Sequence, residues 1–306
     1  MKRIIVLFLI LTSCLSAFSQ RQPSSSTPNS TKKEKEKDNV KDKGFDIIFA
    51  GGCYFGSKYN AQYYNGDSEN ENNINYIFHW YYREINDNIK NYYPYIGDSI
   101  HYGGSLGNMK YRVAVMISLG VRYKFTKNWS IQLMYSFARL KANGQFRLLY
   151  DGEIPGNYHK PLDNNYILGK EDRSLFDLSA CYLFSTKSIV KPFIEAGVQF
   201  NFVRVKSMDA VFYDGEKNRK FKFSFINDRQ DHTPGMQSDG TIVKYGGPGF
   251  GFSASVGIKL AFNKLVSIDP CFYFNVGKFG LEGYKDFSYN FGVSVRIIMN
   301  DSMFSK

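Results

Sequence analysis

Apolar and polar residues alternate with a period of two along most of the chain beyond residue 44. In residues 111–125 every odd position is apolar, while Arg112, Arg122 and Lys124 are among the even positions. Alternation over this length predicts a β-strand with two chemically different faces. Charged side chains on one face and only apolar ones on the other favour a strand between lipid and a polar barrel interior.

The same alternation recurs in seven more segments. They are residues 45–56, 129–137, 176–184, 194–202, 250–262, 266–276 and 287–299. Each approaches or exceeds the roughly 9–11 residues that a tilted strand needs to cross the hydrocarbon of a bilayer. We therefore predict an all-β fold, an antiparallel up-and-down transmembrane β-barrel of eight strands, within residues 45–306.

The connections between these strands have two lengths. Three are short, namely 126–128, 185–189 and 263–264. Three are long, namely 57–110, 143–173 and 206–248, and the last, 281–286, is short but polar. Short and long connections alternate, which places the long ones at one end, as in outer-membrane barrels. An even number of strands then puts both termini at the short-turn end, which predicts periplasmic N- and C-termini.

The first long connection is rich in aromatic residues. Residues 77–82 read Ile-Phe-His-Trp-Tyr-Tyr, and residues 92–95 read Tyr-Tyr-Pro-Tyr. We expect these rings to extend the flanking strands or to form a folded cap. An added hairpin, which would make ten strands, and a surface patch for a partner are the alternatives.

The N-terminus has the features of an export signal. Lys2 and Arg3 precede a short apolar run and the small-x-small site at residues 17–19, which together predict a signal peptide over residues 1–20. Lipoprotein processing at Cys14 is the alternative.

Residues 21–44 are Ser/Thr/Pro-rich and then alternate in charge, with almost nothing to bury. They predict a disordered periplasmic tether.

Composition narrows the class of protein. There are 39 Lys and Arg against 28 Asp and Glu, a net charge of +11, and aromatic residues make up 17% of the chain. So many rings exclude a disordered chain. Beyond the signal peptide, no apolar run approaches the roughly 18 residues of a membrane helix. The basic balance favours anionic lipid headgroups as partners, and a nucleic-acid partner is not expected.

Eight charged residues are predicted to point into the barrel. Eight strands enclose only enough space for their own side chains, so charges of both signs predict a salt-bridged plug. An ion path or a small-solute channel is the alternative. The residues are Arg112, Arg122, Lys124, Asp177, Glu195, Lys259, Asp269 and Arg296.

Aromatic residues flank the short turns, where the membrane interface should lie. They are Tyr123, Phe125, Trp129, Tyr182, Phe184 and Phe262.

No residue pattern indicates catalysis, a cofactor or a metal site. His-x-Glu, Ser-x-x-Lys and His-x-x-x-His spacings are absent, so we expect no enzyme activity. An enzyme at the external rim with a histidine base is the alternative. The histidines are His79, His101, His159 and His232, all in the predicted long loops.

Two strand-turn units carry a resemblance to a known group. Residues 120–129 read Gly-Val-Arg-Tyr-Lys-Phe-Thr-Lys-Asn-Trp, and residues 257–264 read Gly-Ile-Lys-Leu-Ala-Phe-Asn-Lys. With them the chain resembles the small outer-membrane β-barrels of Bacteroidetes-type bacteria. These are similar in layout to OmpA-, OmpX- and OmpW-like eight-stranded barrels and include the PorT-like group.

The resemblance implies the outer membrane of a Gram-negative bacterium and a structural or surface-binding role without catalytic residues. Outer-membrane lipid and lipopolysaccharide are the expected partners. A narrow channel or transporter for small or hydrophobic solutes is one alternative. The PorT-like resemblance implies another, an accessory component of a secretion machine with a surface or periplasmic protein partner. A lipid A-modifying or protease-type barrel is a further alternative.

Overall fold

The structure is a computed structural model. It describes residues 43–67, 100–105, 109–150, 165–184, 190–213, 220–224, 246–262 and 265–300, with single residues 74, 83 and 87. The chain divides into two units, Met1–Val40 and Lys41–Lys306, and every described residue belongs to the second. The predicted signal peptide and nearly all of the predicted tether therefore lie outside the described residues.

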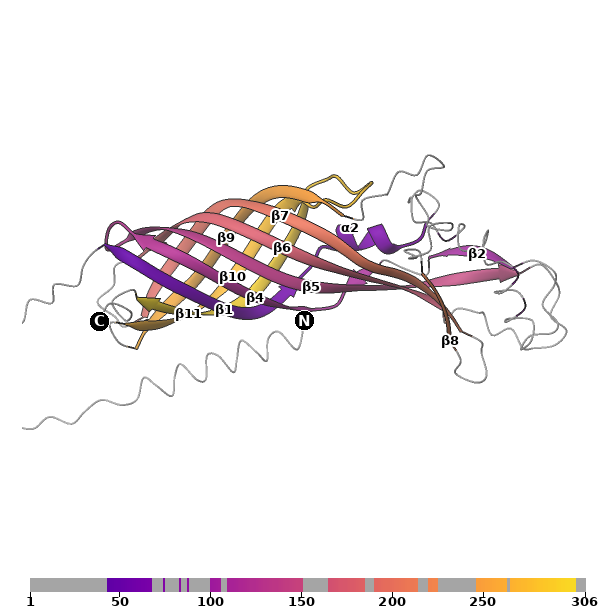
Figure 1. Ribbon diagram of the computed structural model, residues 1–306, viewed down its shortest axis with the longest axis horizontal. Helices are drawn as coiled ribbons and strands as arrows, with labels where there is room; N and C mark the ends of the chain where they lie inside the picture. The colour runs from indigo at the N-terminus through magenta and orange to yellow at the C-terminus, as the bar shows by residue number, and fades with distance from the viewer. Residues whose placement is uncertain are drawn as a thin grey trace, which may run out of the picture. The chain divides into compact units, whose positions relative to one another are not determined.

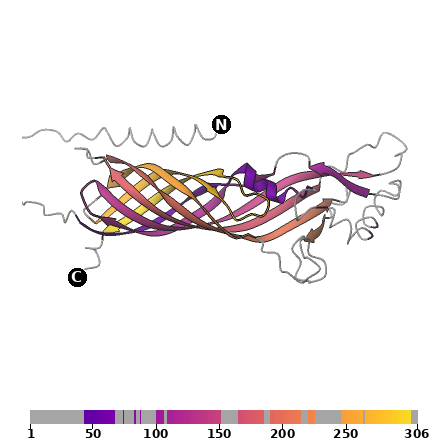
Figure 2. The same cartoon turned by 90° about the horizontal axis from the view of Figure 1, so that it is seen from above.

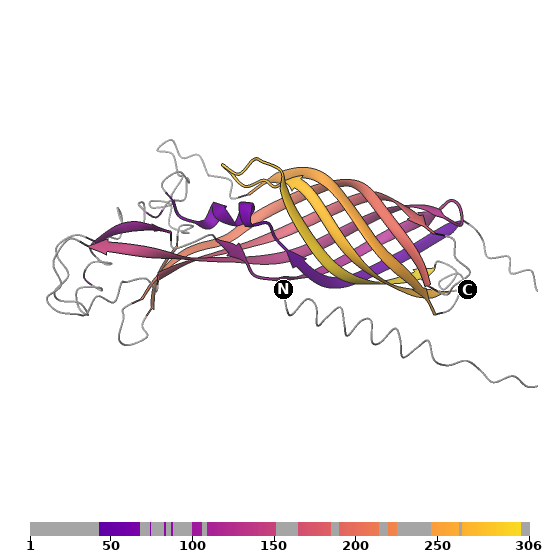
Figure 3. The same cartoon turned by 180° about the vertical axis from the view of Figure 1, so that it is seen from behind.

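Eight antiparallel strands form a closed ring (Figures 1 and 3). In chain order they are β1 (Gly44–Phe55), β4 (Ala114–Lys124), β5 (Trp129–Tyr150), β6 (Asn165–Leu183), β7 (Val190–Tyr213), β9 (Pro248–Ala261), β10 (Val266–Lys278) and β11 (Ser288–Asn300). Each strand pairs with the next, and β1 pairs with β11 to close the ring. The prediction of an all-β, up-and-down barrel is confirmed. In the described residues the ring has eight strands, and the aromatic segments 77–82 and 92–95, on which the ten-strand alternative depends, lie outside the described residues.

The described short turn, residues 126–128, lies beside the end of β6, where the next predicted short connection begins. The turn between β4 and β5 is held by Thr126, whose hydroxyl oxygen accepts a hydrogen bond of 2.9 Å from the Trp129 backbone N–H. The Asn128 side chain donates a 2.7 Å hydrogen bond to the Leu183 carbonyl at the end of β6. Threonine and asparagine suit such turns because their side chains replace missing backbone partners.

The outer face of the ring is apolar from the short-turn end through the middle of the strands. On β5, Trp129, Ile131 and Leu133 are exposed outward, while Ser130 and Gln132 between them are buried inside. The outward residues of the other seven strands repeat this pattern. We call this outer surface the apolar band, and its chemistry matches a hydrocarbon environment.

A charge placed in the apolar band is expected to destabilise the protein in lipid. Val295 lies midway along β11 and is exposed outward. Val295→Arg should cost about 2–4 kcal/mol, the range for arginine near the bilayer midplane. Urea unfolding in lipid vesicles measures it. Leu149→Arg, on the exposed far part of β5, is the matched control and should change stability little. Equal costs for the two variants would contradict the membrane assignment.

Three neighbouring strands continue beyond the ring. β5, β6 and β7 are 22, 19 and 24 residues long, and β2 (Ile100–Ser105) and β8 (Lys220–Ser224) pair with β5 and β7 respectively (Figure 1). The prediction that residues 143–173 and 206–248 are loops is therefore wrong for residues 143–150, 165–173, 206–213 and 220–224. The strands were shorter in the prediction because their outward residues lose apolar character past Phe137, Phe176 and Phe202.

In this extension the chemistry of the two faces is reversed. On β5, Ala138, Leu140 and Ala142 are buried on the inner side, whereas Arg139 and Lys141 are exposed outside. The period of two is unchanged, but the strand now faces water outside and an apolar core inside.

An apolar core fills the inner side of the extension. Two short helices, α2 (Lys58–Ala61) and η1 (Gln62–Tyr64), follow β1 at the end of the ring opposite the short turns (Figure 2). Their Tyr63 and Tyr64 are buried in one cluster with Phe146 and Phe212, whose rings lie 5.4 Å apart. We call this cluster the cap core. No helix in the described ranges has the length and apolar character to cross a membrane.

The start of the second predicted strand differs from the prediction. β3 (Lys110–Tyr111) pairs with β5 as Tyr111↔Ala142, whereas β4 pairs as Met116↔Ala138, so the β3–β4 side carries one extra residue. Such a bulge reverses which side each residue faces. Arg112 is consequently exposed on the outer surface, and the prediction that it points into the lumen is wrong.

Candidate functional site: a filled lumen beneath a buried ion pair

The other seven predicted lumen charges lie on the inner face of the ring. Five are buried and two, both lysines, are partly buried. They are Arg122, Asp177, Glu195, Asp269 and Arg296, with Lys124 and Lys259.

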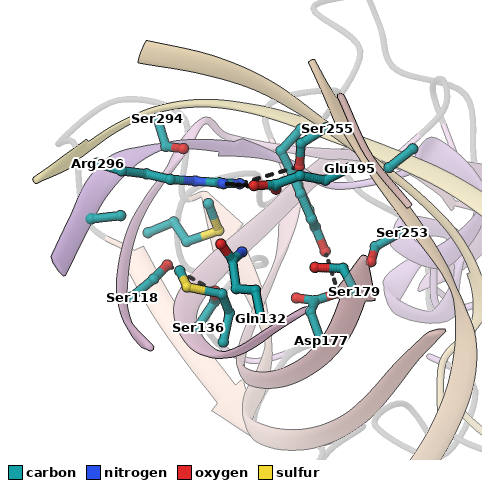
Figure 4. Close-up of a pocket in the computed structure, with 15 residues that line it drawn as sticks. Ser118, Gln132, Ser136, Asp177, Ser179, Glu195, Ser253, Ser255, Ser294 and Arg296 are labelled. Atoms are coloured by element: carbon teal, nitrogen blue, oxygen red, sulfur yellow. Dashed lines mark hydrogen bonds and ion pairs between the residues drawn. The ribbon is translucent and has the colours of Figure 1, made fainter. Parts of the chain in front are cut away.

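Glu195 is the centre of the first lumen network. Its carboxylate accepts hydrogen bonds of 2.6 and 2.7 Å from Arg296 (Figure 4) and one of 3.0 Å from Arg122. Arg122 also donates to the Gln132 side-chain oxygen at 3.0 and 2.7 Å, and lies 3.8 Å from a carboxylate oxygen of Asp269. The contacts join β4, β5, β7, β10 and β11 across the barrel. Each buried charge thereby has an opposite charge beside it, which offsets the cost of removing it from water.

A second network lies four residues further along β7. The Gln199 side-chain amide donates to Asp177 at 2.8 Å and to the Tyr273 hydroxyl, and its oxygen accepts from Asn275 at 2.8 Å. These residues are buried and come from β6, β7 and β10. They fill the lumen with neutral hydrogen-bonding groups around one carboxylate.

A small cavity lies between and beside the networks. The cavity has a volume of about 30 Å³ and is lined mainly by serines and by Asp177, Glu195 and Arg296 (Figure 4). One water needs roughly 10–15 Å³ of such space, so two or three waters fit and a solute does not.

A completely buried ion pair lies where the ring meets the extension. The Arg173 Nε donates to a Glu171 carboxylate oxygen at 2.5 Å, and neither side chain is accessible. The other Glu171 oxygen accepts from the hydroxyls of Tyr64 at 2.6 Å and Tyr111 at 2.9 Å. Arg173 also donates to the Asn290 side-chain oxygen at 3.1 Å.

Aromatic rings enclose the guanidinium of Arg173. Its central carbon lies 4.3 Å from the Phe279 ring centroid and 5.1 Å from that of Tyr111, within the range of cation–π attraction. Burial, and then the Glu171 carboxylate, raise the pKa of the Tyr64 hydroxyl, so Tyr64 remains a proton donor at neutral pH. The ring of Phe279 belongs to the cap core and that of Tyr111 packs against it, so the ion pair is in contact with the cap core.

A smaller pair lies near the short-turn end. Lys124 Nζ is 2.9 Å from an Asp46 carboxylate oxygen. The same oxygen accepts a 2.9 Å hydrogen bond from the Asn300 side-chain amide. Charged pairs thus lie toward both ends of the lumen.

Several of these groups are absent from the sequence-based prediction. Asp46 follows the first residue of the predicted barrel, and Glu171 and Arg173 fall in a predicted loop. A usable signal was the continued period of two, since Glu171, Arg173 and Leu175 alternate with Lys170, Asp172 and Ser174. It was missed because both faces carry polar residues there.

The predicted interface aromatics lie around the short turns on the outer face. Five of the six are exposed, and Tyr182 is half-buried between Trp129 and Phe184, at ring distances of 4.9 and 5.0 Å. The exposed ones are Tyr123, Phe125, Trp129, Phe184 and Phe262.

The histidines lie largely beyond the described ranges. His79, His159 and His232 are outside them, and His101 is in β2 without a described side chain. Within the part of the chain that the structure describes, no three His, Cys, Asp or Glu side chains form a group able to hold a metal ion.

Comparisons with known proteins were made for sequence and structure. No family model matches the chain, and no curated protein matches its sequence. Among solved structures the chain is similar to three small outer-membrane barrels. They are Neisserial surface protein A, or NspA (11% identity, TM-score 0.38, covering 83% of this chain and 95% of that one), OprG of Pseudomonas aeruginosa (11%, 0.32, 84% and 94%), and Ail, the attachment invasion locus protein of Yersinia pestis (10%, 0.31, 84% and 97%). At such identities and TM-scores, no residue, ligand or activity is transferred from them. The Bacteroidetes type stays a prediction.

Proposed function

We propose that this protein is a non-catalytic anchor in the outer membrane of a Gram-negative bacterium. In this role it holds the β5–β7 extension and its cap core at the outer surface of the membrane, where the extension binds a surface partner. The short-turn end, with both termini, faces the periplasm. The single observation that carries the proposal is a closed, apolar-sided ring whose interior is filled by hydrogen-bonded charges. Such a ring is better suited to supporting an external structure than to conducting ions or solutes.

Two features support an anchor over a channel. The lumen cavity of about 30 Å³ is too small for a solute. Beyond it, Glu171 and Arg173 are fully buried and the cap core lies above them. An ion on this route would have to displace paired charges and then cross an apolar core, which costs several kcal/mol for an unpaired charge.

The proposal predicts no steady conductance in planar lipid bilayers. Purified protein should insert and show heat-modifiable gel mobility, yet pass no current above that of a protein-free bilayer. A known porin inserted under the same conditions serves as the sensitivity control for the recording. Regular current steps from the parent protein would reject the anchor and favour the channel. Failure to insert would reject the barrel assignment itself.

A further inference from the structure

We propose that the outer face of β5, β6 and β7, just beyond the apolar band, binds a glycolipid that carries phosphates on its sugar headgroup. Six exposed basic residues form the site, which we call the basic patch. They are Arg112, Arg139, Lys141, Lys170, Arg204 and Lys206. The inference rests on the proposed membrane location.

Strand pairing brings the six residues together. Arg139 on β5 is directly opposite Asp172 on β6, which is opposite Arg204 on β7. Lys141 is directly opposite Lys170 in the next row. The Arg112 backbone N–H donates a 2.8 Å hydrogen bond to the Lys141 carbonyl, which places Arg112 beside that row. Its side chain lies outside the ring because of the bulge described above.

The patch contains an excess of positive charge. One carboxylate, Asp172, lies within it, so the seven residues carry a net charge of +5. Asp172 accepts 2.7 and 3.2 Å hydrogen bonds from Arg139 and lies 3.7 Å from Lys206. The Arg139 hydrogen bonds hold the pKa of the Asp172 carboxyl below its usual range.

The remaining cations repel one another. Like charges directly opposite on neighbouring strands, as in Lys141 and Lys170, destabilise a sheet. An anion bound between the rows removes this repulsion. Arginine and lysine together suit phosphate, because arginine donates two parallel hydrogen bonds and lysine supplies a point charge.

The position of the patch favours a lipid over a soluble anion. Arg139 is two residues beyond Phe137, and Arg204 is two residues beyond the exposed Phe202. Two residues of a strand span about 7 Å. The Arg139 guanidinium carbon lies 6.0 Å from the Phe137 ring centroid. A lipid with acyl chains along the apolar band therefore brings its headgroup phosphates directly to the patch.

The patch occupies one side of the barrel. On the other side, β9 and β10 carry Phe250 and Lys278 at this end, and Phe287 directly precedes β11, so one of these three residues is basic. The glycolipid should consequently be held beside the extension and not all around the ring.

The test compares two triple variants folded in neutral detergent micelles. Lys141→Gln/Lys170→Gln/Arg204→Gln removes half of the patch. Lys43→Gln/Lys58→Gln/Lys285→Gln removes equal charge from exposed sites elsewhere. Native mass spectrometry measures retention of bis-phosphorylated lipid A and of the same lipid after removal of its phosphates. Lys170→Gln alone replaces the patch variant if the triple does not fold.

We expect the patch variant alone to lose affinity for the phosphorylated lipid. The patch variant should bind the phosphorylated lipid about tenfold more weakly than the parent, because it loses one or two charge-assisted hydrogen bonds. The control variant should bind this lipid as tightly as the parent does. Equal weakening in both variants would overturn the proposal. So would equal binding of the dephosphorylated lipid, or equally tight binding of a soluble anionic polysaccharide.

Gel mobility of unboiled samples separates the two proposals. If the parent shows the folded mobility but no lipid selectivity, the patch is rejected and the barrel anchor remains. If the parent lacks the folded mobility, the anchor itself fails.

Discussion

Arg173→Met is expected to lower the free energy of unfolding by about 3–5 kcal/mol, because it leaves the Glu171 carboxylate buried without its cation. The Tyr64 and Tyr111 hydroxyls still donate to Glu171 but cannot neutralise it. Guanidinium unfolding in lipid vesicles, followed by tryptophan fluorescence, gives the difference. The double variant Glu171→Gln/Arg173→Met removes both charges and should recover much of the loss.

Arg139→Met is the matched control for this prediction. Arg139 pairs with Asp172, the residue between Glu171 and Arg173 on β6, but the Arg139 side chain is 60% exposed. Exposed pairs contribute little because water and salt screen them, so the unfolding midpoint should hardly move. If Arg139→Met were as damaging as Arg173→Met, burial would not be the cause. If Arg173→Met were neutral, the buried ion pair would not contribute to stability as described.

Glu195→Ala is expected to have a comparable effect, again about 3–5 kcal/mol, because one carboxylate serves two buried guanidinium groups. Without it, Arg122 and Arg296 lose the carboxylate that they share, and Arg122 keeps a carboxylate oxygen of Asp269 at 3.8 Å. The same unfolding experiment in vesicles measures the loss.

Ser255→Ala provides the neutral comparison for Glu195. The Ser255 hydroxyl accepts a 3.2 Å hydrogen bond from the same Arg296 guanidinium. Its removal should cost about 0.5–1.5 kcal/mol, the usual net value of one hydrogen bond. Equal costs for Ser255→Ala and Glu195→Ala would mean that the charge of Glu195 is not what stabilises the lumen.

The sequence was sufficient for the ring because hydrocarbon imposes a strict outward chemistry. In residues 129–137 every outward residue is apolar, and the predicted strand matches the first part of β5. At Arg139 the outward environment becomes water, so the apolar signal ends although the strand continues. Ala138, Leu140 and Ala142 kept the same period on the inner side, and this weaker signal was overlooked.

The sequence allowed us to predict which residues face the lumen, but not which of those residues contact one another. Alternation placed Glu195 and Arg296 inside, yet their contact joins β7 and β11, which are not neighbours in the ring. Which inner residues meet depends on the tilt and register of all the strands. Arg112 was misplaced because a single extra residue before β4 reverses the two sides, and nothing in the alternation of residues 111–125 marks it.

The change from phenylalanine to arginine on β5 and β7 determines the depth at which the barrel sits. Sinking by two residues, about 7 Å, would carry Arg139 and Arg204 into hydrocarbon, and rising by the same distance would bring Phe137 and Phe202 into water. Both movements are unfavourable, so one vertical position is preferred. Because this boundary lies on β5 and β7, on one side of the ring, it also restricts tilting of the barrel. Each copy should therefore hold its extended sheet at the same height and inclination above the bilayer.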